Sequence, residues 1–203
     1  MNDDILKELA AQLCAALHKR RAMINACSGR FPKKQLFLAL NKCKPVLERR
    51  FGGPVTSRWS VGKKEKPPEA LILEYLVDYG ICRYSIPQAI RQPKQSKPEL
   101  QAGQYYEILL AVESELGDDH EVTRDFLKLL DVKSRIKCLV FRKRPDEQKT
   151  LRLYERIEWI VSHHNLRNPE EQFLLVGLPK AKTATLIDDI EFRCITDGKI
   201  TPL

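Results

Sequence analysis

The chain has 203 residues, of which 43% are hydrophobic and 31% are charged, a balance typical of a globular protein with a core of its own. Its 35 lysines and arginines outnumber 27 acidic residues, and the resulting net charge of +8 is compatible with a polyanionic partner such as nucleic acid. Because no apolar run approaches about 18 residues, we expect no membrane span. The first residues lack a signal-peptide pattern, and we expect a cytoplasmic protein.

The six cysteines are scattered along the chain and form no CxxC or CxxH pair. Tetrahedral zinc sites usually take their ligands from such close pairs, so we expect no zinc knuckle. Most of these cysteines stand among apolar neighbours. They are typical of small buried hydrophobic residues in a reducing compartment.

Two amphipathic helices are expected in the first quarter of the chain. Apolar residues recur at helical spacing over 5–26 and again over 33–50, where Gly52 and the residues after it end the second helix. The following segment is rich in Gly, Pro and Lys. We therefore predict three parts: an N-terminal helical region (1–52), a linker (53–68) and an α/β domain (69–203).

The remainder of the chain alternates strand-like and helix-like segments. Strands are predicted over 70–85, 104–115, 135–143, 173–179 and 185–196, and helices over 120–132 and 147–165. The first half of 70–85 is also compatible with a helix. A polar, Pro-broken excursion over 86–103 separates the first two strands. After the N-terminal helices, this alternation predicts an α/β or α+β fold with a mixed central β-sheet flanked by helices.

Acidic residues stand where two of these strands end. The strand over 104–115 has Ile108, Leu110 and Val112 on one face, with Leu109 and Ala111 on the other, and it ends in the sequence VESE. Because side chains alternate across a strand, Glu113 and Glu115 project to one face, about 7 Å apart.

The preceding strand contributes two more acids, Glu74 and Asp78, which share a face. If this strand pairs antiparallel with the next one, Asp78 meets Glu113 and Glu115 at one edge of the sheet. A buried carboxylate needs a partner, and hard oxygen ligands of this kind suit Mg²⁺ or Mn²⁺.

This arrangement resembles the restriction-endonuclease-like PD-(D/E)xK superfamily. Asp78 matches the first acid of the motif, Glu113-Ser114-Glu115 matches the second half, and DFLKLLDVKSRIKCLVF supplies the helix and strand that follow. The resemblance covers roughly 70–145. It implies a restriction-endonuclease-like core and a Mg-dependent endonuclease that hydrolyses phosphodiester bonds of DNA.

Two positions depart from the usual motif. No proline precedes Asp78, and Glu115 stands where most members have lysine, which gives a Glu-x-Glu variant with a BamHI-like active-site pattern. The resemblance then implies that Asp78 and Glu113 hold the metal and that Glu115 acts as general base or contacts a metal-bound water. Glu74 would be an accessory acid.

Basic residues flank the acids in the sequence and suggest where DNA binds. We expect Arg91, Lys94 and Lys97, in the excursion, and Lys128 and Lys133, after the motif, to contact the phosphate backbone. Solvated surface charge is the alternative interpretation of each cluster. Likewise, the acids alone are compatible with strand-end carboxylates paired to neighbouring Arg and Lys.

Other candidate sites have less support. His163 and His164 are adjacent on a helix and point about 100° apart, so they do not chelate a metal together. Trp59 and Trp159 are interpreted as core or interface residues rather than base-stacking platforms. The sequence contains no Gly-rich phosphate loop and no Ser-His-Asp arrangement in view.

The first interpretation is therefore a metal-dependent nuclease-like protein acting on DNA. The second is a catalytically inactive member of the same fold that serves as a nucleic-acid-binding or protein-interaction module, an alternative favoured by the missing lysine. The third, from another class, is a helical interaction protein whose N-terminal half binds a partner or a second copy of itself in a homodimer.

Overall fold

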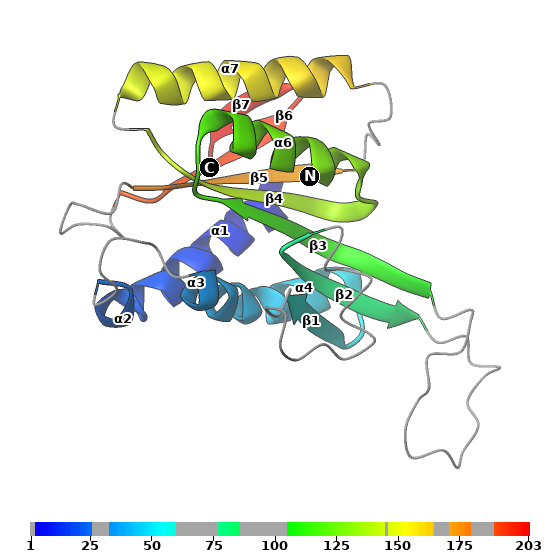
Figure 1. Cartoon of the computed structure of the whole chain (residues 1–203). Coiled ribbons are helices and arrows are strands. Elements are labelled where there is room, and N and C mark those ends of the chain that lie inside the picture. Colours follow the sequence, from blue (N-terminus) through cyan, green and yellow to red (C-terminus); the bar gives the residue numbers. More distant parts are fainter. Residues whose placement is uncertain are drawn as a thin grey trace, which may run out of the picture.

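A seven-stranded sheet with helices on both faces forms the protein in the computed structural model (Figure 1). The structure describes residues 3–25, 33–59, 77–85, 105–144, 146–164, 171–179 and 189–203. Among the helices in these ranges, none combines the length and the apolar character that crossing a membrane requires.

The strands follow one another across the sheet in chain order, from β1 to β7. An antiparallel meander of β1 (Val55–Trp59), β2 (Tyr79–Ser85) and β3 (Tyr105–Glu115) comes first. β4 (Ser134–Arg142) and β5 (Gln172–Leu178) run parallel to β3, and β6 (Glu191–Thr196) and β7 (Lys199–Pro202) return antiparallel. The predicted mixed central sheet flanked by helices is confirmed.

Each parallel connection contains one helix. α6 (Asp119–Asp131) joins β3 to β4, and α7 (Glu147–His163) joins β4 to β5. Both helices lie on the same face of the sheet (Figure 1). The amphipathic pattern explains this, because each helix buries one apolar stripe, such as Val122, Phe126 and Leu129 of α6, against the strands.

The opposite face of the sheet is covered by the N-terminal helices. These are α1 (Asp3–His18), α2 (Arg21–Asn25), α3 (Lys33–Leu40), the 3₁₀ turn η1 (Asn41–Cys43) and α4 (Lys44–Phe51). Leu9, Leu40 and Leu47 from these helices pack in one cluster with Ile136 and Val140 of β4. The predicted N-terminal helical region therefore shares its core with the sheet.

A β-bulge interrupts the pairing of β2 with β3. Ile81 pairs with Leu110, but the next residue, Cys82, pairs with Ile108, so that β3 has one extra residue, Leu109. Leu109 and Leu110 both join the core between the sheet and the N-terminal helices, whereas Ile108 packs on the opposite face of the sheet. The predicted alternation of these three residues is wrong, because a bulge shifts the side-chain phase by one position.

Several predicted elements are confirmed with small changes of boundary, namely α6, β4, α7 and β5. The helix predicted over 5–26 ends at His18 and is followed by the short α2, and the helix predicted over 33–50 is divided by η1, next to Pro45. The linker predicted over 53–68 is wrong for the five residues of β1, and β7 is absent from the predicted elements.

Candidate functional site

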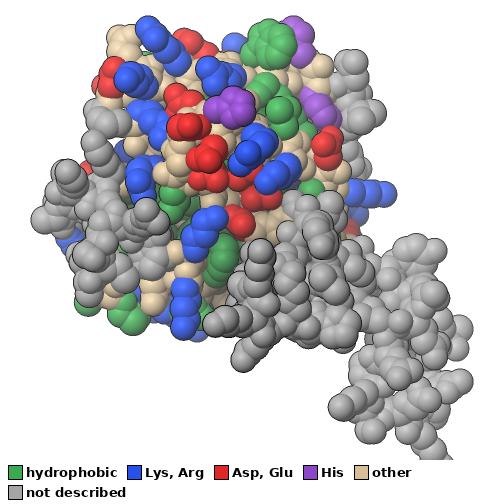
Figure 2. Space-filling view, in the orientation of Figure 1, with side chains coloured by type: hydrophobic (Ala, Val, Ile, Leu, Met, Phe, Trp, Pro, Cys, Tyr) green, Lys and Arg blue, Asp and Glu red, His purple; other side chains and the backbone are tan. Residues whose placement is uncertain are grey.

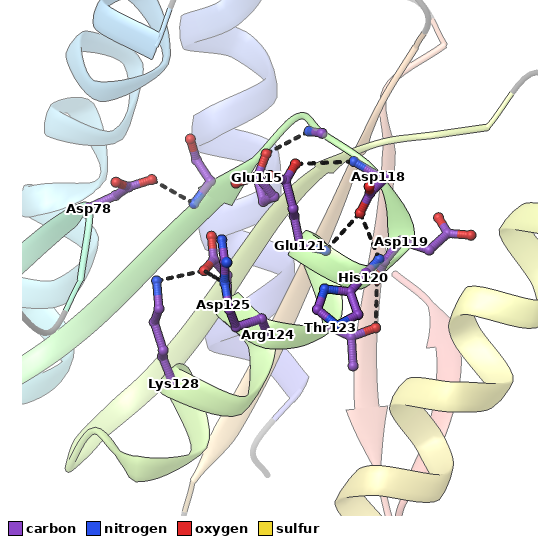
Figure 3. A network of polar contacts seen from close by, with 12 residues as sticks. Asp78, Glu115, Asp118, Asp119, His120, Glu121, Thr123, Arg124, Asp125 and Lys128 are labelled. Carbon is purple, nitrogen blue, oxygen red and sulfur yellow. Dashed lines mark hydrogen bonds and ion pairs between the residues drawn. The ribbon is translucent and has the colours of Figure 1, made fainter.

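Asp78 and Glu113 come together where β2 begins and β3 approaches its end. Tyr79 pairs with Val112 in antiparallel register, so the next residues toward this edge of the sheet are Asp78, just before β2, and Glu113 of β3. The Asp78 carboxylate accepts a hydrogen bond from the backbone N–H of Ser114, with an Oδ2–N distance of 3.0 Å (Figure 3). The side chain of Asp78 thus provides a hydrogen-bond acceptor for β3 just before β2 begins.

The N-terminal helices contribute a lysine to this pair of acids. Lys33, the first residue of α3, donates from Nζ to the same Oδ2 of Asp78 at 3.0 Å. The Lys33 side chain is half exposed, and the Asp78 side chain is 23% exposed, so this ion pair stands at the protein surface. The first helix region therefore reaches the acids that the sequence analysis placed in a separate domain.

α6 adds an acid and a second lysine from above the sheet. Asp125 is buried at the edge of the apolar stripe of α6, and Lys128 Nζ lies 2.6 Å from Asp125 Oδ1 (Figure 3). The two residues are three apart, which places them on one side of the helix. Ala111 of β3 belongs to the same buried layer as α6, and Glu113 follows it on that face of the strand.

Glu113 is a buried carboxylate with a raised pKa. Only 4% of its surface is exposed, and this burial raises the pKa of Glu113 to about 8. The charges of Asp78 and Asp125 raise the pKa further, whereas Lys128 and Lys33 lower it. Near neutral pH Glu113 therefore keeps its proton and becomes ionised when a cation offsets the burial.

Glu115 is turned toward the connection between β3 and α6. Its Oε1 accepts from the backbone N–H of Gly117 at 2.6 Å (Figure 3). A Cβ atom on Gly117 would collide with Glu121 Oε2 and would lie 2.8 Å from Glu115 Oε1, so glycine permits this close approach. Arg144 also holds the turn, because its Nη1 donates to the Gly117 carbonyl at 2.6 Å.

The structure brings some of the predicted site residues together and leaves others apart. Asp78 and Glu113 are neighbours, with Lys128 close by, while Glu115 is bonded within the β3–α6 turn. Lys133 lies just before β4, far from the acids. Leu139, the β4 residue that pairs with Glu113, comes six residues later, which is about 20 Å along the strand. The remaining predicted residues, Glu74, Arg91, Lys94 and Lys97, lie outside the described residues.

Two residues of this site were not among the predicted acids and cations. Asp125 carries a signal in the sequence, because Asp125 and Lys128 have the i, i+3 spacing of a helical ion pair. Lys33 carries none, since it lies 45 residues before Asp78 and reaches it only through the packing of α3. We define the acid pair as Asp78 and Glu113, and its flanking residues as Lys33, Asp125 and Lys128.

The acid pair is suited to a metal that needs few protein ligands. Within the described ranges, no three His, Cys, Asp or Glu side chains form a group that could hold a metal ion. Mg²⁺ commonly takes only one or two carboxylates and completes its octahedron with waters and phosphate oxygens. Two neighbouring carboxylates, one of them buried with a raised pKa, fit that requirement.

Comparison with known proteins yields no relative for this chain. No protein-family model, no curated protein and no solved structure matches it. Any assignment of function therefore depends on the site itself.

Proposed function

We propose that this chain is a divalent-metal-dependent, nuclease-like protein that acts on DNA phosphodiester bonds. The observation that carries the proposal is the position of Asp78 beside Glu113 on adjacent strands, with Glu113 buried and its pKa raised to about 8. A perturbed carboxylate beside a second one is the usual character of a catalytic or metal-binding pair.

The order of the elements around the acid pair supports the same proposal. An acid precedes β2, a Glu-x-Glu sequence ends β3, and then α6 and the parallel strand β4 follow. This is the succession on which the resemblance to the PD-(D/E)xK superfamily is based. We extend the proposal to the fold and assign this part of the chain a restriction-endonuclease-like core.

In the proposed mechanism, Asp78 and Glu113 would hold Mg²⁺ or Mn²⁺. When bound, the metal supplies polarisation of the phosphodiester and a water of lowered pKa. Glu113 must lose its proton to serve as a ligand. Lys128 and Lys33 place positive charge beside the acids, where a phosphate would approach. Glu115, the general base that the resemblance implies, would have to exchange its hydrogen bond from the Gly117 N–H for one from the attacking water.

One observation favours the alternative of an inactive nuclease fold. Lys33 is paired with Asp78, and Lys128 with Asp125, so the two acids that flank Glu113 are neutralised by the chain's own cations. A site closed in this way keeps its structure without a metal. The chain would then serve as a nucleic-acid-binding or protein-interaction module.

Calorimetric titration with Mn²⁺ tests the acid pair directly. We expect the wild-type protein to bind the ion and Asp78→Asn to bind it at least tenfold more weakly. Glu155→Gln, which removes an exposed carboxylate on α7, is the matched control and should bind as the wild type does. Absence of Mn²⁺ binding by the wild type would refute the metal site.

Incubation with DNA then separates the two candidate functions. Supercoiled plasmid and circular single-stranded DNA are incubated with Mn²⁺, or with EDTA as control. Metal-dependent cleavage that is lost in Asp78→Asn supports the nuclease. Metal binding without cleavage of either substrate supports the inactive alternative.

A further inference from the structure

The charged residues of α7 are sorted by sign onto two flanks of the helix. Lys149, Arg152 and Arg156 follow one another at spacings of three and four residues, which places them along one side. Glu147, Glu155 and Glu158 lie on the other side by the same helical geometry. Because the charges are sorted in this way, α7 has one strongly positive flank although the helix as a whole carries little net charge.

Contacts with neighbouring elements show which way each flank of α7 faces. Glu158 accepts from Ile200 N at 2.7 Å and lies 3.3 Å from Lys199 Nζ, so the acidic flank faces β7. Arg156 Nη1 donates to Thr123 Oγ1 of α6 at 3.4 Å, so the positive flank faces α6. In the described part of the chain, Lys149, Arg152 and Arg156 form no ion pair, which leaves their charges available to a ligand.

α6 continues the positive surface toward the acid pair. Arg124 and Lys128 are exposed on α6 and lie on the side of this helix that carries Asp125. Lys and Arg side chains surround an acidic patch on this face and extend above it along the upper edge of the molecule (Figure 2). We call the surface formed by Arg124, Lys128, Lys149, Arg152 and Arg156 the cationic track.

An exposed aromatic residue follows on the same flank of α7. Trp159 is 62% exposed, so of the two roles predicted for it, core or interface residue, the core role is wrong. It comes three residues after Arg156, and His163 stacks against it with ring centroids 4.4 Å apart. The His163 ring also contacts the Trp159 carbonyl oxygen, with an Nδ1–O distance of 2.8 Å, and this contact holds the stack in place.

We propose that the cationic track binds the backbone of a single-stranded nucleic acid and that one base stacks on Trp159. Cations in a line attract phosphates, and an exposed indole offers a stacking surface to a base that is not already stacked in a duplex. An acidic protein would pair with the cations but would leave the indole unused. The proposal rests on the proposed function in one respect, that the strand continues from the track to the acid pair.

Binding of a labelled single-stranded oligonucleotide, followed by fluorescence anisotropy in EDTA across a salt series, tests the track without involving the metal. The double variant Arg152→Glu, Arg156→Glu should bind at least tenfold more weakly. Its log–log salt slope should be smaller by about 1.4, because each of the two cations that neutralises a phosphate of a single strand contributes about 0.7 to the slope. The control is Lys42→Glu with Arg50→Glu, an equal change of charge at exposed positions beneath the other face of the sheet, which should bind within twofold of wild type.

Trp159 is tested by its own pair of variants. Trp159→Ala should lose about 5- to 100-fold in affinity with an unchanged salt slope, whereas Trp159→Phe should retain most of the binding. The same sequence as a duplex should bind more weakly than the single strand. Equal affinity of the α7 variants and the wild type, or full competition by polyglutamate, would overturn the proposal.

The two proposals fail separately. Oligonucleotide binding is measured in EDTA, without a metal, and Mn²⁺ binding is measured without an oligonucleotide, so that each proposal has a readout of its own. If the track variants bind the oligonucleotide as the wild type does and the wild type binds Mn²⁺, the track is refuted and the proposed function is retained. If the track variants bind the oligonucleotide more weakly and the wild type does not bind Mn²⁺, the metal site is refuted and the track is retained.

Discussion

At the scale of single residues, the site depends on the burial of each carboxylate and on the donors and cations that contact it. Asp78 is partly exposed and has two donors on one oxygen, Lys33 Nζ and the Ser114 N–H. Glu113 is buried and its pKa is raised to about 8, although Lys33 and Lys128 act in the opposite direction. The two neighbouring acids therefore differ in environment, which is the condition for different roles in acid–base or metal chemistry.

The raised pKa of Glu113 predicts how stability varies with pH. The folded protein keeps a proton up to about pH 8 that the unfolded chain, with a pKa of 4.5 for this group, releases much earlier. The contribution of Glu113 to folding stability is thus complete below pH 4.5 and is lost as the pH rises through 8. Relative to Glu113→Gln, which does not titrate, the wild type should become progressively less stable over this window.

Thermal unfolding of both proteins between about pH 4.5 and 9 measures this difference. Glu155→Gln, at an exposed site, serves as control and should follow the wild type at every pH. A constant difference in melting temperature between the wild type and Glu113→Gln would mean that Glu113 titrates normally.

At the scale of elements, α6 connects the site to the remainder of the sheet. Asp118 caps the helix by accepting from the N–H groups of His120 and Glu121, each at 2.9 Å, and Glu121 completes a capping box by accepting from the Asp118 N–H. Asp118 is therefore the N-cap of α6. The cap fixes where α6 begins and hence where Asp125 and Lys128 stand relative to β3.

Removal of this cap should destabilise the protein moderately. Asp118→Ala leaves two N–H groups at the start of α6 without their acceptor, and we expect the melting temperature to fall by roughly 2–4 °C. Asp146→Ala at the start of α7 is a useful comparison. Within the described residues the Asp146 side chain accepts from one backbone N–H, that of Gln148, so its removal should cost less. Calorimetric scans of the three proteins provide the measurement, and an unchanged melting temperature of Asp118→Ala would contradict the capping role.

At the scale of the whole molecule, two helical layers enclose one sheet. Leu40 of α3 is 1% exposed and belongs to the same cluster as Leu110 and Val140 of the central strands. A helix layer that shares its core with the sheet is expected to unfold with it, and Lys33 reaches Asp78 only while this layer stays in place.

Truncation of Leu40 tests this coupling. Leu40→Ala should lower the free energy of unfolding by about 2–5 kcal/mol, while circular dichroism and tryptophan fluorescence still report one coincident transition. Leu127→Ala, at a residue that is 44% exposed on α6, is the matched control and should cost well under half as much. Two separate transitions in either variant would indicate that the N-terminal layer folds independently.

Periodicity in the sequence is sufficient to identify the elements that bury a regular apolar pattern. α6, β4, α7 and β5 are predictable for this reason, because each shows its hydrophobic spacing without reference to a partner. β1 and β7 are not, since they are short edge strands of mixed polarity whose conformation depends on pairing with β2 and β6. The bulge at Leu109 is also hidden from the sequence, because it is a property of two paired strands.

The sequence predicts that three acids, Asp78, Glu113 and Glu115, meet if their strands pair antiparallel. The structure makes Asp78 and Glu113 neighbours and bonds Glu115 within the turn that follows. Other members depend on contacts between segments far apart in the chain. Lys33 joins the site because α3 packs beneath the meander, Asp125 because α6 crosses above it, and the burial that perturbs Glu113 arises only between these layers. Local spacing reports which side chains share a face, whereas desolvation and long-range ion pairing arise only once the layers have packed.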